Sequence, residues 1–342
     1  MVKPFQFGTK KIGPGNPAYI IAEIGVNHEG SVEDCARMIK AAADAGADAI
    51  KLQTCDPEEN YVPGTESYEL FKTCELSKSE TAQMFQYARD LKIDPFTTSP
   101  DPITLEWVNK LNPAGHKISS GMMTNPVIIK KTAQTGKPVL MSTGMANEEQ
   151  IDEAVSWVKD YGDMKQLGLF QCTSIYPAPY ETLNLSTIRA MQERYNVPVG
   201  FSDHTEGTDI AAAAVFAGAH IIEKHFTLDK TRPSFDHKLS LEPTEMALLV
   251  KKVREAEIIL GQATKSVEGN LANNAVKYLR TLVARRDIQA DEILDENNVA
   301  LKRALPDKRG MEAKQYDFVL GQRTRKALTK NEPITEQDIY KL

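Results

Sequence analysis

Short runs of apolar and β-branched residues alternate with amphipathic segments along the first ~260 residues of the chain. Between the runs, segments such as 32–45 carry apolar residues at positions 35, 38, 41, 42 and 45, the spacing of a helix with one buried face. This alternation predicts a parallel sheet built from βα units. The eight runs are 18–23, 48–53, 95–98, 116–119, 138–142, 167–172, 197–201 and 220–225.

Eight strand–helix units in this length match the size and count of a (β/α)8 TIM barrel. A doubly wound open sheet is the structural alternative. No Gly-x-Gly-x-x-Gly motif follows the first run, which disfavours the dinucleotide-binding version of that sheet. Residues 56–78 interrupt the alternation after the second run, and we interpret them as an inserted loop over one face of the barrel.

The pattern changes after a predicted helix at 242–261. Residues 262–277 are polar and lack clear periodicity, which is typical of a linker, and residues 278–342 predict a small, mostly β domain. Within that domain, 284–299 align with 324–339; the pair Arg285 and Arg325 and the pair Glu292 and Glu332 coincide. The repeat predicts two pseudo-symmetric halves, with chance similarity of two turn-rich segments as the alternative. The expected domains are therefore a catalytic barrel over 1–261, a linker over 262–277 and a small β domain over 278–342.

Composition and charge narrow the class of protein. The chain has 41 Lys+Arg against 47 Asp+Glu and a net charge of −6, which argues against the clustered basic surface of a nucleic-acid-binding protein. The longest apolar run, 210–222, is too short to span a bilayer, and no apolar signal core stands near the N-terminus. Four cysteines without Cys-x-x-Cys spacing fit reduced thiols. We expect a cytoplasmic protein with no membrane and no nucleic-acid partner.

Polar residues stand at the end of almost every predicted strand. In a barrel these ends meet at one face, where the chemistry of such folds is found. Packing alone explains such a set poorly, because a buried polar group without a partner costs several kcal/mol. We therefore interpret the set as an active site. Its members are Glu23, Lys51, Gln53, Thr97, Thr98, Lys117, Ser119, Ser120, Ser142, Thr173, Tyr176, Ser202, Asp203, His204, Glu223, Lys224 and His225.

Two histidines suggest a metal, with two ordinary hydrogen-bonded histidines as the alternative. His204 and His225 end neighbouring strands, so their imidazoles could bind one divalent ion. Asp236 follows the last strand and could orient a ligand nearby, or lie in a surface turn. The lysines with nearby serine hydroxyls suit a small phosphorylated carboxylate, because ammonium groups supply charge and hydroxyls supply oriented donors.

Alternation along the last strand places Glu223 and His225 on one face and Lys224 on the other, which leaves Lys224 outside the site unless the strand has ended. Glu23 could hold a water, a sugar hydroxyl or a proton, or form a salt bridge to Lys51.

Seven motifs in order along the chain resemble those of the sialic acid synthases (the N-acetylneuraminate synthase family). The motifs are Ala22-Glu-Ile-Gly-Val-Asn-His-Glu-Gly30, Lys51-Leu-Gln-Thr54, Lys117-Ile-Ser-Ser-Gly121, Leu140-Met-Ser-Thr-Gly-Met145, Gln171-Cys-Thr-Ser-Ile-Tyr-Pro-Ala-Pro179, Gly200-Phe-Ser-Asp-His204 and Ile222-Glu-Lys-His-Phe226. The last ~65 residues resemble the antifreeze-like (SAF) domain of that family.

The resemblance implies a barrel plus SAF domain, working as a domain-swapped homodimer in which each SAF domain covers the partner's barrel mouth. It implies condensation of phosphoenolpyruvate with an N-acetylated mannosamine-type aldose to a nine-carbon 2-keto-3-deoxy acid and phosphate, with C–O cleavage. It also implies a divalent metal, Mn²⁺ first and Mg²⁺ or Co²⁺ as alternatives, on His204 and His225. With these two, Glu23 would be catalytic. Phosphoenolpyruvate would be held by Lys51, Lys117, Ser120, Ser142 and Ser202, and the sugar by Gln53, Tyr176, Asp236 and Arg303.

Three segments depart from the family pattern where the sugar should lie: Ser174 in place of a common Asn, the segment from Arg232 to Asp236, and the segment around Arg303, which leaves Arg309 as a competitor. Legionaminic, pseudaminic and spore-coat sugar synthases therefore stay open as alternatives within the family.

A heptulosonate-type synthase, an alternative outside the family, would need further arginines for a second phosphate. A Schiff-base aldolase would use Lys117 or Lys51. A non-catalytic carbohydrate- or ice-binding protein would have no use for the paired histidines.

Overall fold

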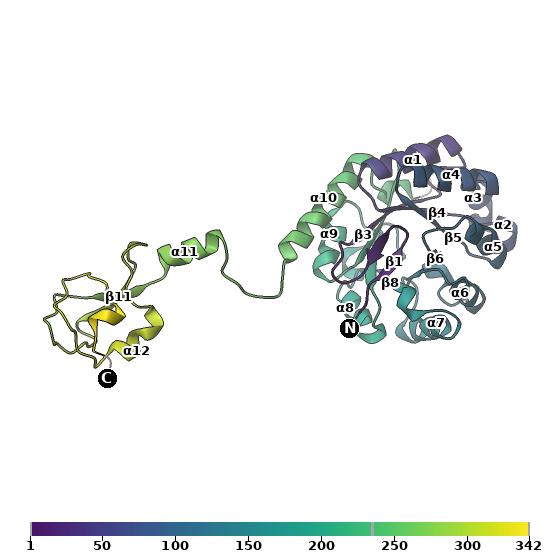
Figure 1. Cartoon of the computed structure of the whole chain (residues 1–342). Coiled ribbons are helices and arrows are strands. Elements are labelled where there is room, and N and C mark those ends of the chain that lie inside the picture. The colour runs from purple at the N-terminus through teal and green to yellow at the C-terminus, as the bar shows by residue number, and fades with distance from the viewer. Residues whose placement is uncertain (1, 234–235, 341–342) are drawn as a thin grey trace. The chain divides into compact units, whose positions relative to one another are not determined.

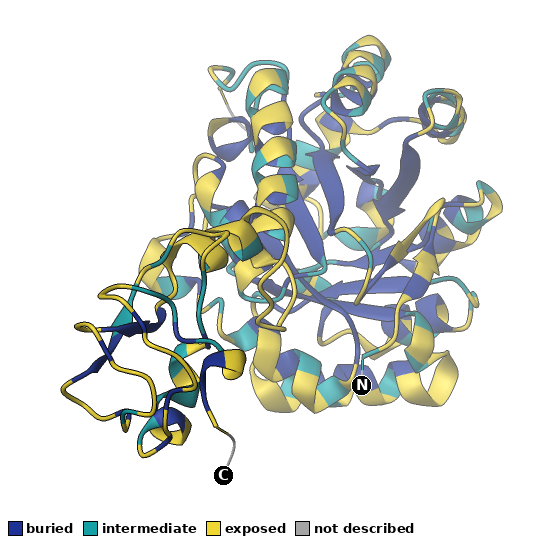
Figure 2. Ribbon diagram, turned by 60° about the vertical axis from the view of Figure 1, so that its left-hand side comes forward, coloured by how far each residue is buried: buried dark blue, intermediate teal, exposed yellow. Residues whose placement is uncertain are grey.

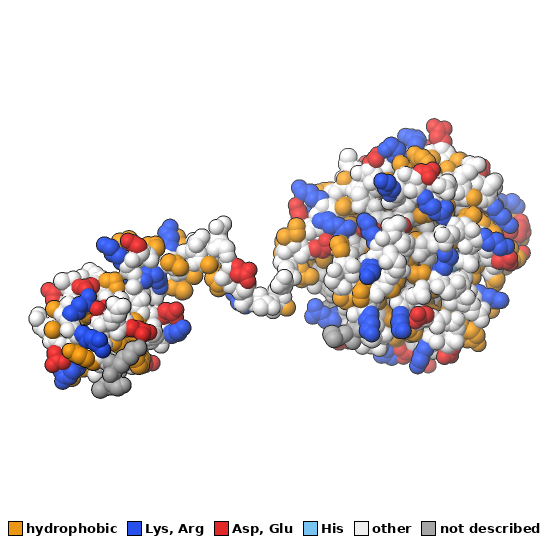
Figure 3. All heavy atoms as spheres, in the orientation of Figure 1, with side chains coloured by type: hydrophobic (Ala, Val, Ile, Leu, Met, Phe, Trp, Pro, Cys, Tyr) orange, Lys and Arg blue, Asp and Glu red, His pale blue; other side chains and the backbone are white. Residues whose placement is uncertain are grey.

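The computed structural model describes residues 2–233 and 236–340 of the chain. The chain forms two compact units, Met1–Gly261 and Gln262–Leu342 (Figure 1). Among the described residues, no helix is long and apolar enough to cross a membrane. On the face of the first unit that Figure 3 displays, basic and acidic side chains both occur.

Eight parallel strands of the first unit close into a barrel, in the order β10-β3-β4-β5-β6-β7-β8-β9. They are β3 (Tyr19–Gly25), β4 (Ala49–Gln53), β5 (Asp94–Thr98), β6 (His116–Ile118), β7 (Val139–Ser142), β8 (Leu167–Cys172), β9 (Val199–Asp203) and β10 (Ile221–His225). The closed barrel confirms the predicted (β/α)8 fold over the open sheet. β9 begins two residues later than expected, because Pro198 has no N–H to give to a ladder.

Helices surround the barrel and turn their apolar faces inward, as the blue inner and yellow outer faces of the ribbons in Figure 2 show. The helix α1 follows the predicted stripe: Cys35, Met38, Ile39 and Ala42 are buried, and Ser31 caps its start by accepting from the Asp34 N–H. The other surrounding helices are α4 (Lys78–Asp90), α5 (Pro102–Lys110), α6 (Pro126–Ala133), α7 (Glu148–Tyr161), α8 (Thr187–Tyr195), α9 (Asp209–Phe216) and α10 (Pro243–Leu260), and α1 spans Val32–Asp44.

An N-terminal hairpin that the sequence pattern did not predict covers the end of the barrel where the strands begin. It consists of β1 (Phe5–Phe7) and β2 (Lys10–Ile12), paired antiparallel. Phe7 packs edge-on against Tyr19 and Phe96, which fills the barrel interior with aromatic rings. The polar site therefore lies above an apolar layer inside the barrel.

The insert after β4 is helical, so the prediction of a loop was wrong. It contains α2 (Pro57–Asn60) and α3 (Glu66–Cys74). Asp56 and Thr65 cap these helices with their side chains, and Pro57 stands at the first helical position of α2. The capping residues Asp56 and Thr65 are present in the sequence as signals of a helix start, but each helix is too short to show apolar periodicity.

The second unit starts with a helix, α11 (Asn270–Tyr278), so the latter half of the predicted linker is ordered rather than extended. Its other regular elements are β11 (Thr281–Ala284), β12 (Val299–Lys302) and the short α12 (Tyr316–Val319). Leu282, Val299, Val319, Leu328 and Ile334 belong to a small core that is separate from that of the barrel.

The internal repeat of this unit is a structural one. Ile288 and Leu328, 40 positions apart, exchange both backbone hydrogen bonds (2.8 and 2.9 Å). Asp291 N–H donates to the Thr324 carbonyl, and 40 residues later Asn331 N–H donates to the Ala284 carbonyl in the same way. Asp291 and Asn331 both adopt positive φ. Two halves related in this manner confirm the pseudo-symmetric fold that the repeat predicted.

Candidate active site

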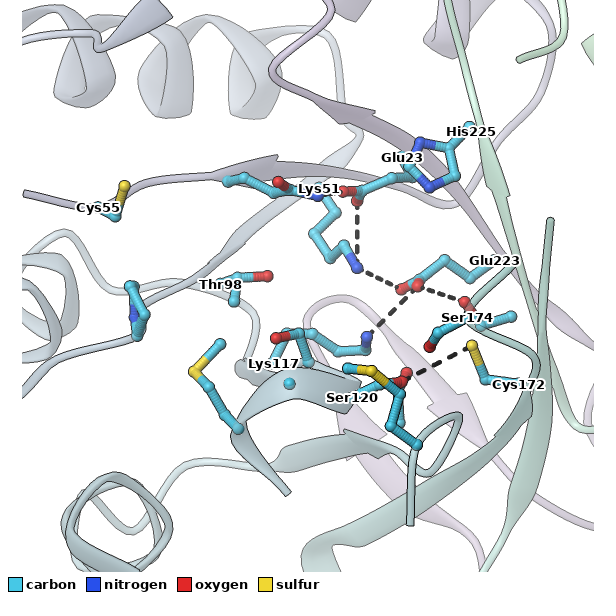
Figure 4. Close-up of a pocket in the computed structure, with 18 of the residues that line it drawn as sticks. Glu23, Lys51, Cys55, Thr98, Lys117, Ser120, Cys172, Ser174, Glu223 and His225 are labelled. Carbon is cyan, nitrogen blue, oxygen red and sulfur yellow. Dashed lines mark hydrogen bonds and ion pairs between the residues drawn. The ribbon is translucent and has the colours of Figure 1, made fainter. Parts of the chain in front are cut away.

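A pocket of about 460 Å³ lies at the carboxyl ends of the barrel strands (Figure 4). All eight strands line it: Glu23, Lys51, Thr98, Lys117, Ser142, Cys172, Ser202 and Glu223 each project from a different strand. Ten of the twelve predicted site residues line this pocket. The ten are Glu23, Lys51, Gln53, Lys117, Ser120, Ser142, Tyr176, Ser202, His204 and His225.

Two predicted residues do not line the pocket. Asp236 lies beside it, with its Oδ2 3.4 Å from Nδ1 of His225. Arg303 belongs to the second unit, where its guanidinium stacks 5.0 Å above the ring of Tyr278. Its competitor Arg309 is engaged elsewhere, because it donates to the carbonyls of Val276 and Leu279 at the end of α11. Of the two arginines, Arg303 has the freer guanidinium.

The floor of the pocket is a buried network of two lysines and two carboxylates (Figure 4). Lys51 Nζ lies 2.9 Å from Glu223 Oε2 and 3.2 Å from Glu23 Oε2. Lys117 Nζ lies 3.4 Å from Glu223 Oε1, which also accepts a hydrogen bond from Ser202 Oγ at 2.9 Å. The sequence-based alternative of a Glu23–Lys51 salt bridge is thus present, and Glu223 joins it to Lys117.

The two lysines differ in their electrostatic surroundings. Burial disfavours the ammonium form of Lys51, but the carboxylates of Glu223 and Glu23 outweigh it and raise the pKa of Lys51. For Lys117 the effect of burial is larger than that of the nearby Glu223 carboxylate, and it lowers the pKa of Lys117 to about 8. Burial opposes ionisation of Glu223 as well, yet the Lys117 and Lys51 ammonium groups outweigh it and hold the pKa of Glu223 below its usual value.

Glu23 is set apart as a proton carrier. Burial raises the pKa of Glu23 to about 7, although Lys51 pulls in the other direction. Its Oε1 accepts a hydrogen bond from Gln53 Nε2 at 3.0 Å. A carboxyl group that titrates near neutral pH can both give and take a proton during a reaction.

The two histidines lie side by side with ring centroids 5.3 Å apart, and Tyr176 packs on His204 at 4.2 Å. Burial, together with the charge of Lys51, lowers the pKa of His225 to about 3; burial, together with His225, lowers that of His204 to about 4. His204 Nδ1 lies 2.7 Å from the Thr173 carbonyl, so this nitrogen carries the proton and donates it. The lone pair of His204 is therefore on Nε2, and two neutral imidazoles fit a divalent ion.

No group of three or more His, Cys, Asp or Glu side chains within residues 2–233 and 236–340 is arranged to hold a metal. An ion held by His204 and His225 alone would complete its coordination with water or substrate oxygens, which is typical of an open catalytic site.

Hydrogen bonds between two loops fix the position of Asp236. Asn27, after β3, donates to the Phe226 carbonyl and to Ser240 Oγ, both at 3.0 Å, and Asp236 N–H donates to Asn27 Oδ1. His237 is fully buried between Glu29 Oε1 (2.9 Å) and the Thr227 hydroxyl. These contacts place the carboxylate of Asp236 against His225.

Comparison with known proteins shows which family this chain belongs to. The model of the NeuB family matches residues 38–265, and that of the SAF domain matches residues 280–339. The chain belongs to the NeuB family. It is 38% identical to an uncharacterized protein of Methanocaldococcus jannaschii (94% of each chain) and 34% identical to the N,N'-diacetyllegionaminic acid synthase of Campylobacter jejuni (93% and 98%).

Among solved structures, the crystal structure of N-acetylneuraminic acid (sialic acid) synthetase from Leptospira borgpetersenii in complex with citrate is 35% identical, with a TM-score of 0.76 over 80% of this chain and 95% of that one. Pseudaminic acid synthases and a spore coat polysaccharide biosynthesis protein are further NeuB-family relatives. The family resemblance in the motifs is thus confirmed, and the named synthases among the relatives make sugar acids.

Several pocket residues of this NeuB-family chain were not predicted from the sequence. Tyr61 and Phe71 of the insert stack at 5.3 Å and line the pocket. Cys172 lies inside a quoted motif and accepts a hydrogen bond from Ser120 Oγ at 3.8 Å. Glu223, in contrast, belongs to the strand-end set that the sequence predicted, and its alternation with His225 indicated an inward side chain. Lys224, by contrast, points away and pairs with Asp203 at 3.0 Å, as alternation predicted.

Proposed function

We propose that this NeuB-family chain condenses phosphoenolpyruvate with an N-acetylated mannosamine-type aldose, giving a nine-carbon 2-keto-3-deoxy acid and phosphate. The observation that carries the proposal is the buried floor of Lys51 and Lys117 beside a pair of neutral histidines. Two cations and several hydroxyls suit a substrate that carries both a phosphate and a carboxylate.

The lysines and serines bind phosphoenolpyruvate in this proposal. Ser142 Oγ is buried and makes no hydrogen bond within the described part of the chain, so it has a donor to give to an anion. Ser120 and Ser202 hold neighbouring hydroxyls, and Lys51 stays cationic because two carboxylates flank it. Glu223 keeps the two ammonium groups in place before the substrate arrives.

In this proposal, His204, His225 and the neighbouring Asp236 bind and activate the aldehyde end of the sugar. We propose that His204 and His225 hold a divalent ion, with Mn²⁺ as first choice. When bound, such an ion polarises a carbonyl oxygen as a Lewis acid. Asp236 orients His225, while Gln53 and Tyr176 line the same part of the pocket and bind the sugar.

Bond formation then joins C3 of phosphoenolpyruvate to the aldehyde carbon. Water adds to C2, and phosphate leaves by cleavage of the C–O bond. Glu23 transfers protons in these steps, since a carboxyl group with a pKa of about 7 can both donate and accept a proton near neutral pH. The insert residues Tyr61 and Phe71 exclude further water from the cationic carbon at C2.

The sugar is the open part of the proposal. Ser174 lines the pocket where sialic acid synthases commonly carry Asn, so an aldose of the legionaminic, pseudaminic or spore-coat type is the alternative substrate. We also propose a homodimer in which the second unit of one protomer serves the barrel of its partner. A cytoplasmic location agrees with the four cysteines, which are all free thiols.

A phosphate-release assay tests the function directly. Phosphoenolpyruvate is mixed with a panel of N-acetylated aldoses, including mannosamine-type and 2,4-diacetamido sugars. With one of these aldoses, phosphate should be released from phosphoenolpyruvate at a rate well above that with the others. With ¹⁸O at the bridging position of phosphoenolpyruvate, the label should appear in the phosphate. Label in the keto acid would refute C–O cleavage. Sugar binding without any phosphate release would favour the carbohydrate-binding alternative.

A further inference from the structure

Lys117 differs from Lys51 in how its amine is held. Lys51 Nζ contacts two carboxylates, at 2.9 and 3.2 Å, whereas Lys117 Nζ has a single ion pair, at 3.4 Å to Glu223. On its other side Lys117 Nζ lies 5.2 Å above the ring centroid of Phe170, a fully buried side chain of the barrel interior. Lys117 is therefore the weakly paired amine of the site, with an apolar surface below it.

We propose that Lys117 is also a nucleophile, which captures the ketone carbon of a 2-keto acid as an imine. This second activity uses the same pocket but does not require the condensation proposed above. A lysine becomes nucleophilic when it is desolvated or lies next to another cation. Lys117 meets both conditions, because it is buried and Lys51 shares its partner Glu223.

The charged groups facing Lys117 support this assignment. Glu223 and Glu23 favour its ammonium form, while burial and Lys51 oppose it, and the balance brings the pKa to about 8. The nearby Cys172 stays a neutral thiol, since burial raises its pKa. At pH 7 to 8 the neutral fraction of such an amine exceeds that of an ordinary lysine by roughly two orders of magnitude.

The step balances without an added oxidant or reductant. The lone pair on Nζ attacks C2 of the keto acid, and the carbonyl oxygen takes up a proton. The resulting carbinolamine loses water, and its nitrogen loses a proton, to give the imine. Lys51 and the Ser142 hydroxyl, which makes no hydrogen bond among the described residues, can bind the carboxylate of the keto acid meanwhile.

Reductive trapping tests the proposal. The full-length protein is incubated with pyruvate and cyanoborohydride between pH 7 and 9, and the adduct is located by peptide mass mapping. We expect one adduct per chain, on Lys117, with at least about tenfold more label than on any other lysine. Its yield should rise most steeply around pH 8 and approach a plateau near pH 9, because half of Lys117 is neutral at its pKa and most of it is neutral one unit higher. Lys51 and the buried Lys224 serve as internal comparators.

The variant Lys117→Arg keeps the charge but cannot form an imine, so it should lose the adduct. Inorganic phosphate and phosphoenolpyruvate should protect the wild type, because an anion in the pocket stabilises the ammonium form. Label spread over exposed lysines with no enrichment at Lys117, or label on Lys51, would overturn the proposal even if the variant failed to fold. Trapping in a protein that releases no phosphate with any aldose would refute the condensation and leave this inference standing.

Discussion

Glu223 carries three contacts at the centre of the pocket, to Lys51, to Lys117 and to Ser202. Alternation along β10 was enough to turn it inward, but the sequence could not pair it with particular lysines. Those lysines project from β4 and β6, and only the closure of the barrel brings them to one carboxylate. Pairings across a barrel depend on strand tilt and stagger, which a residue pattern does not encode.

Replacing Glu223 by Gln should destabilise the protein by about 3 kcal/mol, because two buried ammonium groups lose their shared counter-charge. The matched control is Glu23→Gln, which leaves Lys51 paired with Glu223 and should cost less. Denaturant unfolding of the two variants gives the comparison. Equal stability of Glu223→Gln and the wild type would show that the lysines do not need this carboxylate.

Removal of metal is the second test at the scale of single residues. Chelation with EDTA should abolish phosphate release, and Mn²⁺ should restore it in the wild type. His225→Ala should keep its fold, since an alanine removes a neutral side chain, yet should not recover with Mn²⁺. Circular dichroism provides the folding control. Full activity in excess chelator would contradict the two-histidine site.

At the scale of elements, the loops after β3 and β10 act as one structure. His237 lies between Glu29 of the first loop and Thr227 of the second, next to Asp236 in the chain. The sequence left open whether Asp236 orients a ligand or lies in a surface turn. The hydrogen bonds that Asn27 accepts from Asp236 N–H and Glu29 accepts from His237 show that this loop is held in place.

Glu29→Ala should therefore lower kcat/KM for the sugar about tenfold, because losing a hydrogen bond to a buried histidine costs about 1–2 kcal/mol. The KM for phosphoenolpyruvate should not change, since its lysines are on other strands. Glu29→Gln keeps an acceptor for His237 Nε2–H and should behave as the wild type. A parallel loss for both substrates would mean that the loop supports the whole barrel rather than Asp236.

Short elements were the ones that the pattern of the sequence missed. The strands β1 and β2 have three residues each, too few to show alternation, and they pack against residues spread along the chain from Tyr19 to Ile221. The insert helices α2 and α3 were equally short of a periodic signal. The eight barrel strands, in contrast, were predicted because each repeats the same buried pattern between long amphipathic helices.

For the whole molecule, exposed apolar side chains support the proposed homodimer. Ile258 and Ile259 at the end of α10 are 79% and 73% exposed, and Leu271 and Leu279 in and after α11 are 50% and 62% exposed. Exposed large apolar side chains that adjoin one another within a unit, as Ile258 and Ile259 do, are typical of a protein interface. Residues 262–269 can extend to at most about 26 Å at ~3.3 Å each, and the nine-residue α11 adds about 14 Å. This span allows the second unit to serve either its own barrel or that of a partner.

Arg303 distinguishes the two arrangements. Its guanidinium makes no hydrogen bond among the described residues and stacks only on Tyr278, so it has all of its donors to give to a sugar. Arg303→Ala should raise the sugar KM on the order of ten- to a hundredfold, the effect of losing a charge-assisted hydrogen bond, and should leave the KM for phosphoenolpyruvate unchanged. Lys302→Ala is the matched control, because Lys302 Nζ already bonds Asn331 within its own unit.

Mixing two impaired variants, assayed at a sugar concentration well below the KM of Arg303→Ala, then decides which barrel the second unit serves. If Arg303 acts in trans, a heterodimer of Arg303→Ala and His225→Ala contains one site with both defects and one site with neither, so activity should reappear to about half that of the wild type. If Arg303 acts in cis, every site keeps one defect and mixing restores nothing. Differently tagged protomers, purified as verified heterodimers, make the two outcomes distinct. No recovery in such heterodimers would contradict the domain-swapped arrangement while leaving the barrel chemistry untouched.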